Sequence, residues 1–169
     1  MKKTLSVVAI LGLSACMGGG GDGGVSLVSN SVDATMNDDF EVLLNGVRTS
    51  NATWDTDIAR AVQDHADDMV NEGYLSVNIP GTTNPNNSSG MRDIGDRMVE
   101  EGYTWNELGQ YVTEGDKTLT EVFNEFNALP CGNAGQDLCL DDVIYENFGI
   151  GKADNGGEPK WAFAIASPG

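Results

Sequence analysis

Residues 161–166 read Trp-Ala-Phe-Ala-Ile-Ala, and this short stretch decides the fold of the chain. Bulky side chains alternate with alanine at every second position. Successive side chains of a β-strand point to opposite faces of its sheet, so the pattern predicts a strand with one bulky face and one tight face. We expect this strand, residues 160–166, to close the domain.

The sequence before this strand predicts a hairpin. Residues 154–159 (Asp-Asn-Gly-Gly-Glu-Pro) are a cluster of turn formers, and residues 143–150 are rich in β-branched and aromatic side chains. Two strands joined by this turn pair antiparallel. Residues 111–113 add a short third strand to the expected sheet.

Four earlier segments carry the i, i+3, i+4 spacing of hydrophobic residues that is typical of amphipathic helices. The expected helix starts are Asn37 or Asp38, Asp55 or Asp57, a point near Met91, and the capping-box pair Thr118 and Glu121. The expected helix ends are Val47, Gly73, Gly102 and Pro130. The fold class is therefore α+β, an α-β-α-type sandwich of about four helices around a small antiparallel sheet.

The N-terminus predicts a secretory signal that ends in a lipid anchor. Lys2 and Lys3 precede an uncharged, mostly apolar run over residues 4–15, which is shorter than the roughly 20 residues that span a bilayer. Residues 13–16 (Leu-Ser-Ala-Cys) resemble the lipobox of bacterial lipoproteins. The resemblance implies cleavage before Cys16 and attachment of lipid to it. No Asp follows the cysteine, so we expect the outer membrane if the host has one.

The chain thus divides into a signal peptide (residues 1–15), a lipidated, glycine-rich tether (residues 16–37) and one domain (residues 38–169). The whole chain has 9 Lys+Arg against 26 Asp+Glu, a net charge of −17. Removal of Lys2 and Lys3 with the signal peptide leaves 7 − 26 = −19. So acidic a surface excludes nucleic-acid binding, and anionic lipid headgroups repel it. We therefore expect the lipid at Cys16 to attach the protein to the membrane.

Several short motifs follow one another in a set order between residues 38 and 166. They are Leu44-Asn45 with Arg48, Trp54-Asp55-Thr56-Asp57-Ile58, His65-Ala66-Asp67-Asp68-Met69, Gly73-Tyr74, Asp96-Arg97-Met98, Gly102-Tyr103, residues 109–115 and Phe148-Gly149-Ile150-Gly151. This order resembles the CAP superfamily (SCP/PR-1-like domains), especially its bacterial secreted branch. The resemblance implies a secreted domain with a central cavity.

The chain departs from the family where the family binds metal. Many members carry two His and two Glu in the cavity, which can hold a divalent ion such as zinc. Here the first His position falls in residues 75–77, which include Val77, and Gln110 replaces a Glu. Residues 130–132 contain no second His, and Asn147 stands near an acidic position. The resemblance therefore implies a cavity without metal or cofactor.

His65 is the single histidine of the chain and lies on the apolar stripe of the second expected helix. One interpretation is a packed histidine with a local hydrogen bond. The other is a titrating residue that lines a remnant cavity with Gln110 and Asn147. A single histidine with scattered carboxylates does not supply the convergent donors of a zinc site.

Cys131 and Cys139 are the cysteines that remain beside Cys16, and outside the cytoplasm such a pair predicts a structural disulfide. A redox pair is the alternative, although the CxxC spacing is missing. Residues 137–142 and 154–158 offer oxygen atoms to calcium, but neither matches an EF-hand loop, and solvated turns account for both.

These observations predict a lipid-anchored, extracytoplasmic domain that binds a protein, glycan, peptide or small apolar ligand at the cell envelope without catalysis. One alternative is an envelope hydrolase that uses His65 with Glu114 or Glu72. A second alternative is a structural spacer without a ligand.

Overall fold

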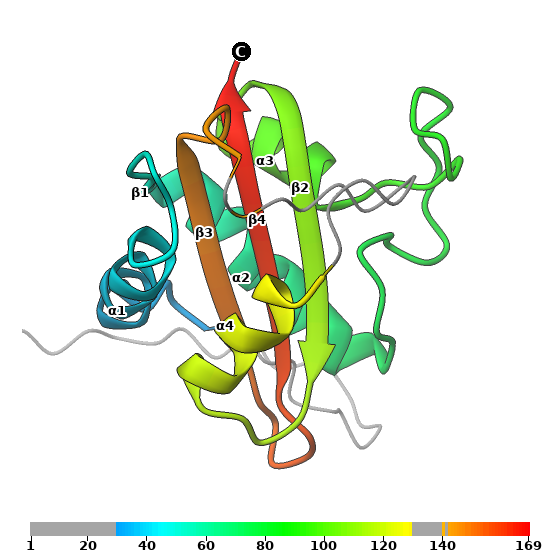
Figure 1. Cartoon of the computed structure of the whole chain (residues 1–169). Helices are drawn as coiled ribbons and strands as arrows, with labels where there is room; N and C mark the ends of the chain where they lie inside the picture. The colour runs from blue at the N-terminus through cyan, green and yellow to red at the C-terminus, as the bar shows by residue number, and fades with distance from the viewer. Residues whose placement is uncertain (1–29, 130–139, 141) are drawn as a thin grey trace, which may run out of the picture.

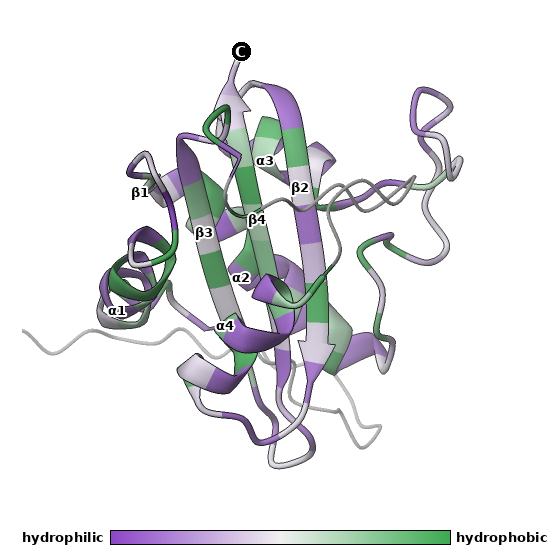
Figure 2. Ribbon diagram, in the orientation of Figure 1, coloured by the Kyte–Doolittle hydropathy of each residue, from purple (hydrophilic) through white to green (hydrophobic). Residues whose placement is uncertain are grey.

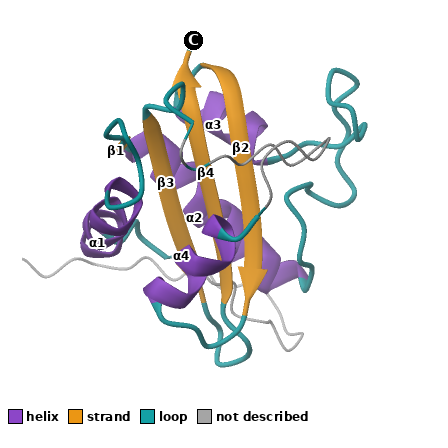
Figure 3. Ribbon diagram, viewed as in Figure 1, coloured by secondary structure: helices purple, strands orange, loops and turns teal. Residues whose placement is uncertain are grey.

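A four-stranded mixed sheet with the strand order β1-β3-β4-β2 forms the centre of the computed structural model, which describes residues 30–129, 140 and 142–169 (Figures 1 and 3). The elements are α1 (Ala34–Asn45), β1 (Thr53–Trp54), α2 (Thr56–Glu72), α3 (Ile94–Glu101), β2 (Trp105–Glu114), α4 (Leu119–Asn127), β3 (Asn147–Ala153) and β4 (Lys160–Pro168). The predicted α+β class is confirmed.

The predicted hairpin is confirmed, because β3 and β4 pair antiparallel, with Ile150 opposite Phe163. Its first strand covers residues 147–153 rather than the predicted 143–150. Two expectations about the sheet need correction. The third strand, β2, is ten residues long rather than three and pairs with β4 along its length. The sheet is also mixed rather than antiparallel, because the two-residue strand β1 pairs parallel to β3. So short a strand carries almost no periodic signal in a sequence.

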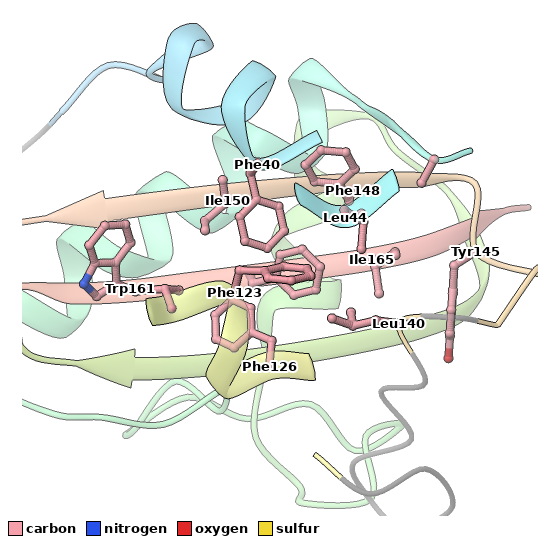
Figure 4. Close-up of a cluster of buried hydrophobic side chains, with 13 residues drawn as sticks. Phe40, Leu44, Phe123, Phe126, Leu140, Tyr145, Phe148, Ile150, Trp161 and Ile165 are labelled. Carbon is pink, nitrogen blue, oxygen red and sulfur yellow. The ribbon is translucent and has the colours of Figure 1, made fainter. Parts of the chain in front are cut away.

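The two faces of β4 differ as its alternating sequence predicts. Trp161, Phe163 and Ile165 join side chains of α1 and α4 in one buried cluster (Figure 4). Ala162, Ala164 and Ala166 lie in a second cluster against α2 and α3. Figure 1 shows α4 in front of the sheet and α2 and α3 behind it, which gives three layers. Figure 2 shows hydrophobic segments along β3 and β4, between helices that carry both kinds of residue.

Phe40 of α1 is the centre of the aromatic cluster. Its ring centroid lies 5.2 Å from that of Phe163, 5.7 Å from that of Phe148 and 5.8 Å from that of Phe123, which is oriented edge-on. All these distances fall in the range where aromatic pairs attract beyond simple area burial. The cluster therefore joins α1 and α4 to the strands that close the domain.

On the opposite face, α2 contacts the sheet backbone to backbone. A Cβ atom added to Gly149 would lie 2.5 Å from the amide nitrogen of Ala59, and one added to Gly151 would lie 2.6 Å from that of Gln63. Real Cβ atoms do not approach so closely. The two glycines of β3 are thus required by the close approach of α2 rather than by backbone conformation.

The helix ends follow the predicted caps with two corrections. Asp55 caps α2, which ends at Gly73 in the left-handed region (φ 71°), and Thr118 and Glu121 form the predicted capping box of α4. However, α1 begins at Ala34 with Asp33 as N-cap, so Asn37 and Asp38 are not its cap and residues 34–37 are helix rather than tether. Likewise α3 begins at Ile94, after Met91.

Asn37 has a different role, because its side chain completes the open edge of β3. Its amide oxygen accepts from Ile150 N at 3.0 Å, and its amide nitrogen donates to Ile150 O at 3.1 Å. Gln63 of α2 bonds the N–H and C=O of Lys152 in the same way. These two side-chain amides replace a neighbouring strand where β1 has ended, so the edge is not left for another chain to pair with.

The motif Leu44-Asn45 with Arg48 is structural here. Asn45 exchanges two hydrogen bonds of 2.9 Å with the backbone of Ala52. Arg48 is buried and donates to the carbonyl oxygens of Leu140, Asp142 and Tyr145. The loop before β1 and the segment before β3 are therefore both held from the end of α1.

The predicted signal peptide, the lipid site Cys16 and the disulfide between Cys131 and Cys139 lie outside the described residues. Among the helices of residues 30–129, 140 and 142–169, none has the length and apolar character needed to cross a bilayer.

Candidate functional site

His65 lies on α2 and is completely buried. Its Nε2 atom is 2.7 Å from the carbonyl oxygen of Ser76, and because a carbonyl only accepts, Nε2 carries the proton. Desolvation by burial lowers the pKa of His65 to about 4, against the smaller raising effect of the Ser76 hydrogen bond. The imidazole is therefore neutral at physiological pH.

A layer of polar side chains surrounds His65 between α2, α3 and β2. Tyr74 meets the imidazole edge-on at 5.9 Å between ring centroids, and burial raises the pKa of its phenol to about 12. Arg97 of α3 forms an ion pair with Asp68 of α2. Three buried side-chain atoms of this layer have no hydrogen-bond partner among the described residues: His65 Nδ1, Arg97 Nε and Gln110 Oε1.

Gln110 reaches this layer from β2. It points to the same side of the sheet as Leu108 and Val112, which pack on the second buried cluster, between the sheet and helices α2 and α3 (the α2 cluster). Its Nε2 atom donates to Asp93 Oδ2 at 2.9 Å, and Asp93 is the N-cap of α3. Asp93 is also one of the carboxylates whose charge acts on His65. Asp93 therefore holds the side chain of Gln110, while His65 is bonded to Ser76.

Asn147 is the third residue of the predicted cavity, and it has other partners. Its Oδ1 atom accepts from Tyr103 Oη at 3.0 Å, and its Nδ2 atom donates to Thr53 Oγ1 at 3.3 Å. It begins β3 opposite Ala166, whereas Gln110 lies opposite Ala164 on the other side of β4. Asn147 therefore fixes the start of β3 to β1, and its role in a ligand site stays a prediction.

A surface pocket adjoins this layer at Asp93, and sequence reasoning missed it. Its volume is about 430 Å³, and its lining residues come from the loop before α3, the first turn of α3 and the start of β2. They are Asn84, Asn86, Asn87, Ser88, Asp93, Asp96 and Trp105. We call this the Trp105 pocket. Figure 3 shows the loop between α2 and α3 extending beyond the β2 edge of the sheet. The sequence predicts this loop, because residues 78–90 are rich in Asn, Pro, Gly, Ser and Thr, but it shows no sign of the pocket.

Solved structures share this architecture. An extracellular protein of Bacillus anthracis that contains an SCP domain matches with a TM-score of 0.58 and 15% identity, over 79% of this chain and 39% of that one. This chain thus spans well under half of that protein. An outer surface protein from Borrelia burgdorferi matches with a TM-score of 0.59 and 9% identity, over 80% of this chain and 91% of that one.

The chain has the CAP superfamily fold. No protein-family model matches the sequence, and no curated protein matches it. The agreement with solved structures is therefore one of backbone arrangement, reached at identities that leave few side chains in common.

The residues at the CAP metal positions do not fit a zinc ion. Val77 has no donor atom and packs on the α2 cluster. Gln110 presents a neutral amide whose nitrogen is engaged with Asp93, and the protonated Nε2 of His65 is engaged with Ser76. Residues 130–132 lie outside the described ranges. Within those ranges, no three His, Cys, Asp or Glu side chains gather closely enough to hold a metal ion.

Proposed function

We propose that this protein is a lipid-anchored, extracytoplasmic CAP-fold module that binds a ligand at the cell envelope without catalysing a reaction. The observation that carries the proposal is the state of His65. It has no exposed surface, its Nε2 atom is committed to Ser76, and burial keeps it neutral with a pKa of about 4. A general base must reach its substrate, and this imidazole does not reach the surface.

Glu114, one of the two carboxylates expected to assist His65 in a hydrolase, is engaged elsewhere. Glu114 forms an ion pair with Lys160 at the far end of β2. The carboxylates whose charges act on His65 are Asp68, which is paired with Arg97, and Asp93, which accepts from Gln110. The polar layer around His65 therefore supports the start of α3 and, through it, the Trp105 pocket.

The envelope location rests on the sequence and on two solved neighbours. Cys16 ends a lipobox-like stretch, and 13 residues lie between it and Asn30. The reach from membrane to domain is therefore at most about 50 Å of extended chain. The two neighbours are called an extracellular protein and an outer surface protein, in agreement with this proposal.

Two measurements on the full chain test the proposal. Metabolic labelling with palmitate should mark the wild-type protein and not Cys16→Ser, and this variant should also leave the membrane fraction. Photocrosslinking in the native envelope should then capture the same partner with His65→Gln as with wild type. If the wild-type protein turns over an envelope peptide or glycan and His65→Gln does not, the binding proposal is wrong and the protein is a hydrolase. An empty crosslinking result with both proteins would favour the spacer.

A further inference from the structure

We propose that the Trp105 pocket is a recognition site for a neutral oligosaccharide. This inference rests on the proposed function, since it names the class of ligand that the module binds. The pocket volume of about 430 Å³ lies in the range of roughly 300–1,000 Å³ that is usual for small-ligand sites. Three properties of its walls select a hydroxyl-rich, uncharged ligand.

The first property is the aromatic wall. Trp105 is 37% exposed, and among the described residues it is the one aromatic side chain that counts as exposed rather than half-buried or buried. Its indole is held in place, because Nε1 donates to Gly95 O at 3.4 Å and a Cβ on Gly95 would lie 3.1 Å from the ring. A fixed, accessible indole offers a flat apolar surface to the C–H face of a sugar ring.

The second property is a pair of side-chain amides that are fixed at both ends. Asn84 donates to Asp96 Oδ1 at 2.7 Å and accepts from the amide of Asn86 at 2.9 Å. Asn87 donates to Asp93 Oδ2 at 2.7 Å and accepts from the amide of Ser89 at 3.1 Å. A primary amide has two N–H groups and two lone pairs, so each side chain has a spare N–H donor. Asn84 also has a spare lone pair, whereas the oxygen of Asn87 accepts a second bond from Ser89 Oγ at 3.1 Å.

Hydroxyl groups donate and accept at once, which makes them the natural complement of these amides. Because the amides are already oriented, binding a ligand costs little further side-chain entropy. The same arrangement gives selectivity, since a ligand without hydroxyls would leave polar groups of the pocket unpaired.

The third property is charge. Asp93 and Asp96 line the pocket, and none of the described residues that line it is a Lys or Arg. An anionic ligand would meet two carboxylates without a counter-charge, so neutral sugars are favoured over acidic ones. Both carboxylates already accept hydrogen bonds from side-chain amides. Asp93 accepts from Asn87 and Gln110, and Asp96 accepts from Asn84. The same oxygen atoms can accept further hydrogen bonds from the O–H groups of a ligand.

The test uses the full chain and a defined panel of probes: maltotetraose, cellotetraose, mannotetraose and chitotetraose as neutral sugars, and sialyllactose as an acidic one. Isothermal titration calorimetry should detect binding of at least one neutral sugar of the panel and weaker binding of sialyllactose. Trp105→Ala should lower the affinity for the neutral sugar by about tenfold. Trp105→Phe should lower it by less, since an aromatic ring remains. Asn87→Ala should also weaken it, whereas Asn124→Ala, an exposed asparagine on α4, should not.

Binding of a neutral sugar that is unchanged in both Trp105→Ala and Asn87→Ala would overturn the assignment, and so would a panel without any neutral binder. Loss of binding in EDTA would overturn it too, because it would place a cation between sugar and protein. If the panel fails while crosslinking captures a protein partner, the sugar assignment fails and the binding module stands. If a panel sugar is hydrolysed and His65→Gln stops the hydrolysis, the proposed function itself fails.

Discussion

At the scale of single residues, His65 is defined by its burial. It is the single histidine of the chain, and its ring is enclosed by α2, Tyr74 and the Ser76 carbonyl. One interpretation of the sequence gave it a local hydrogen bond, and the other placed it in a cavity beside Gln110. The structure shows the local bond to Ser76 and places the side chain of Gln110 on Asp93. The buried, neutral state favours the packed histidine over the titrating cavity residue.

This burial predicts a pH-dependent stability. The pKa of His65 is about 4 in the folded chain and near 6.5 when exposed, so between these values the unfolded chain binds more protons. The free energy of unfolding should therefore fall as the pH drops from about 6.5 to about 4, by at most about 3 kcal/mol from this group. Above about pH 6.5 the imidazole is neutral in both the folded and the unfolded chain, so this loss of stability is absent.

Urea unfolding of wild type and His65→Gln at a series of pH values measures this effect. Gln retains a donor for the Ser76 carbonyl but does not titrate, so the wild-type advantage should shrink toward pH 4. Parallel profiles for the two proteins over this range would show that His65 is not the responsible group.

At the scale of elements, the contact between α2 and β3 sets the strictest limit on substitution. Gly149→Ala should destabilise the fold by about 2–3 kcal/mol, because the new methyl group would meet the backbone of Ala59 and neither element has room to move. Thermal or chemical unfolding measures the loss. Gly157→Ala, in the exposed turn between β3 and β4, is the control and should change stability by about 0.5 kcal/mol or less.

Equal losses in the two alanine variants would mean that glycine acts through the unfolded chain rather than through this contact. Gly102 provides no such comparison, because its φ of 107° makes any substitution strained.

The elements also show how far the sequence predicts the molecule. Periodicity located α2, α4 and β4, because their hydrophobic faces repeat over several turns or residue pairs. The strand before β4 was predicted from its β-branched and aromatic composition, four residues too early. Periodicity did not locate β1, whose two residues depend on the backbone of Asn147 and Phe148. The start of α1 was missed because Asp33 and Asn37 are both good caps, and Asn37 is instead bonded to Ile150.

The Trp105 pocket was beyond sequence reasoning for a related physical reason. Asn84 and Asp96, and Asn87 and Asp93, come together through side-chain hydrogen bonds between a loop and a helix end. Neither the loop nor the cap has a periodic pattern that reports such pairing. The family resemblance directed attention to Gln110, which donates to Asp93 but is not itself among the lining residues of the pocket.

At the scale of the whole molecule, the segment before α1 is fixed to α2. Asn30 donates from its backbone and from its side chain to the two oxygens of Asp67, each at 2.7 Å, and Asp67 is buried. Gln63 adds a third donor at 3.2 Å. The point at which the chain enters the domain is therefore defined.

Asp67→Ala should release this attachment. Exchange of the Asn30 amide hydrogen should accelerate at least about tenfold, and the fold should lose about 1.5–3 kcal/mol, because hydrogen bonds to a buried carboxylate disappear. Hydrogen-exchange NMR follows the first effect and urea unfolding the second. Asp68→Ala breaks the partly exposed pair with Arg97 and should leave the Asn30 amide protected. Protection of Asn30 that survives in Asp67→Ala would refute the attachment.

This entry point determines how the molecule would be displayed. Asn30 lies beside Lys152, which pairs with Trp161 near one end of β4, whereas Trp105 pairs with Pro168 at the other end. Pro168 lies seven residue positions after Trp161 along the strand, a distance of about 24 Å. Many copies fixed by their N-termini would therefore present their indoles outward as an array. On such an array a repetitive polymer would engage several weak sites at once, and avidity rather than single-site affinity would set how firmly it is held.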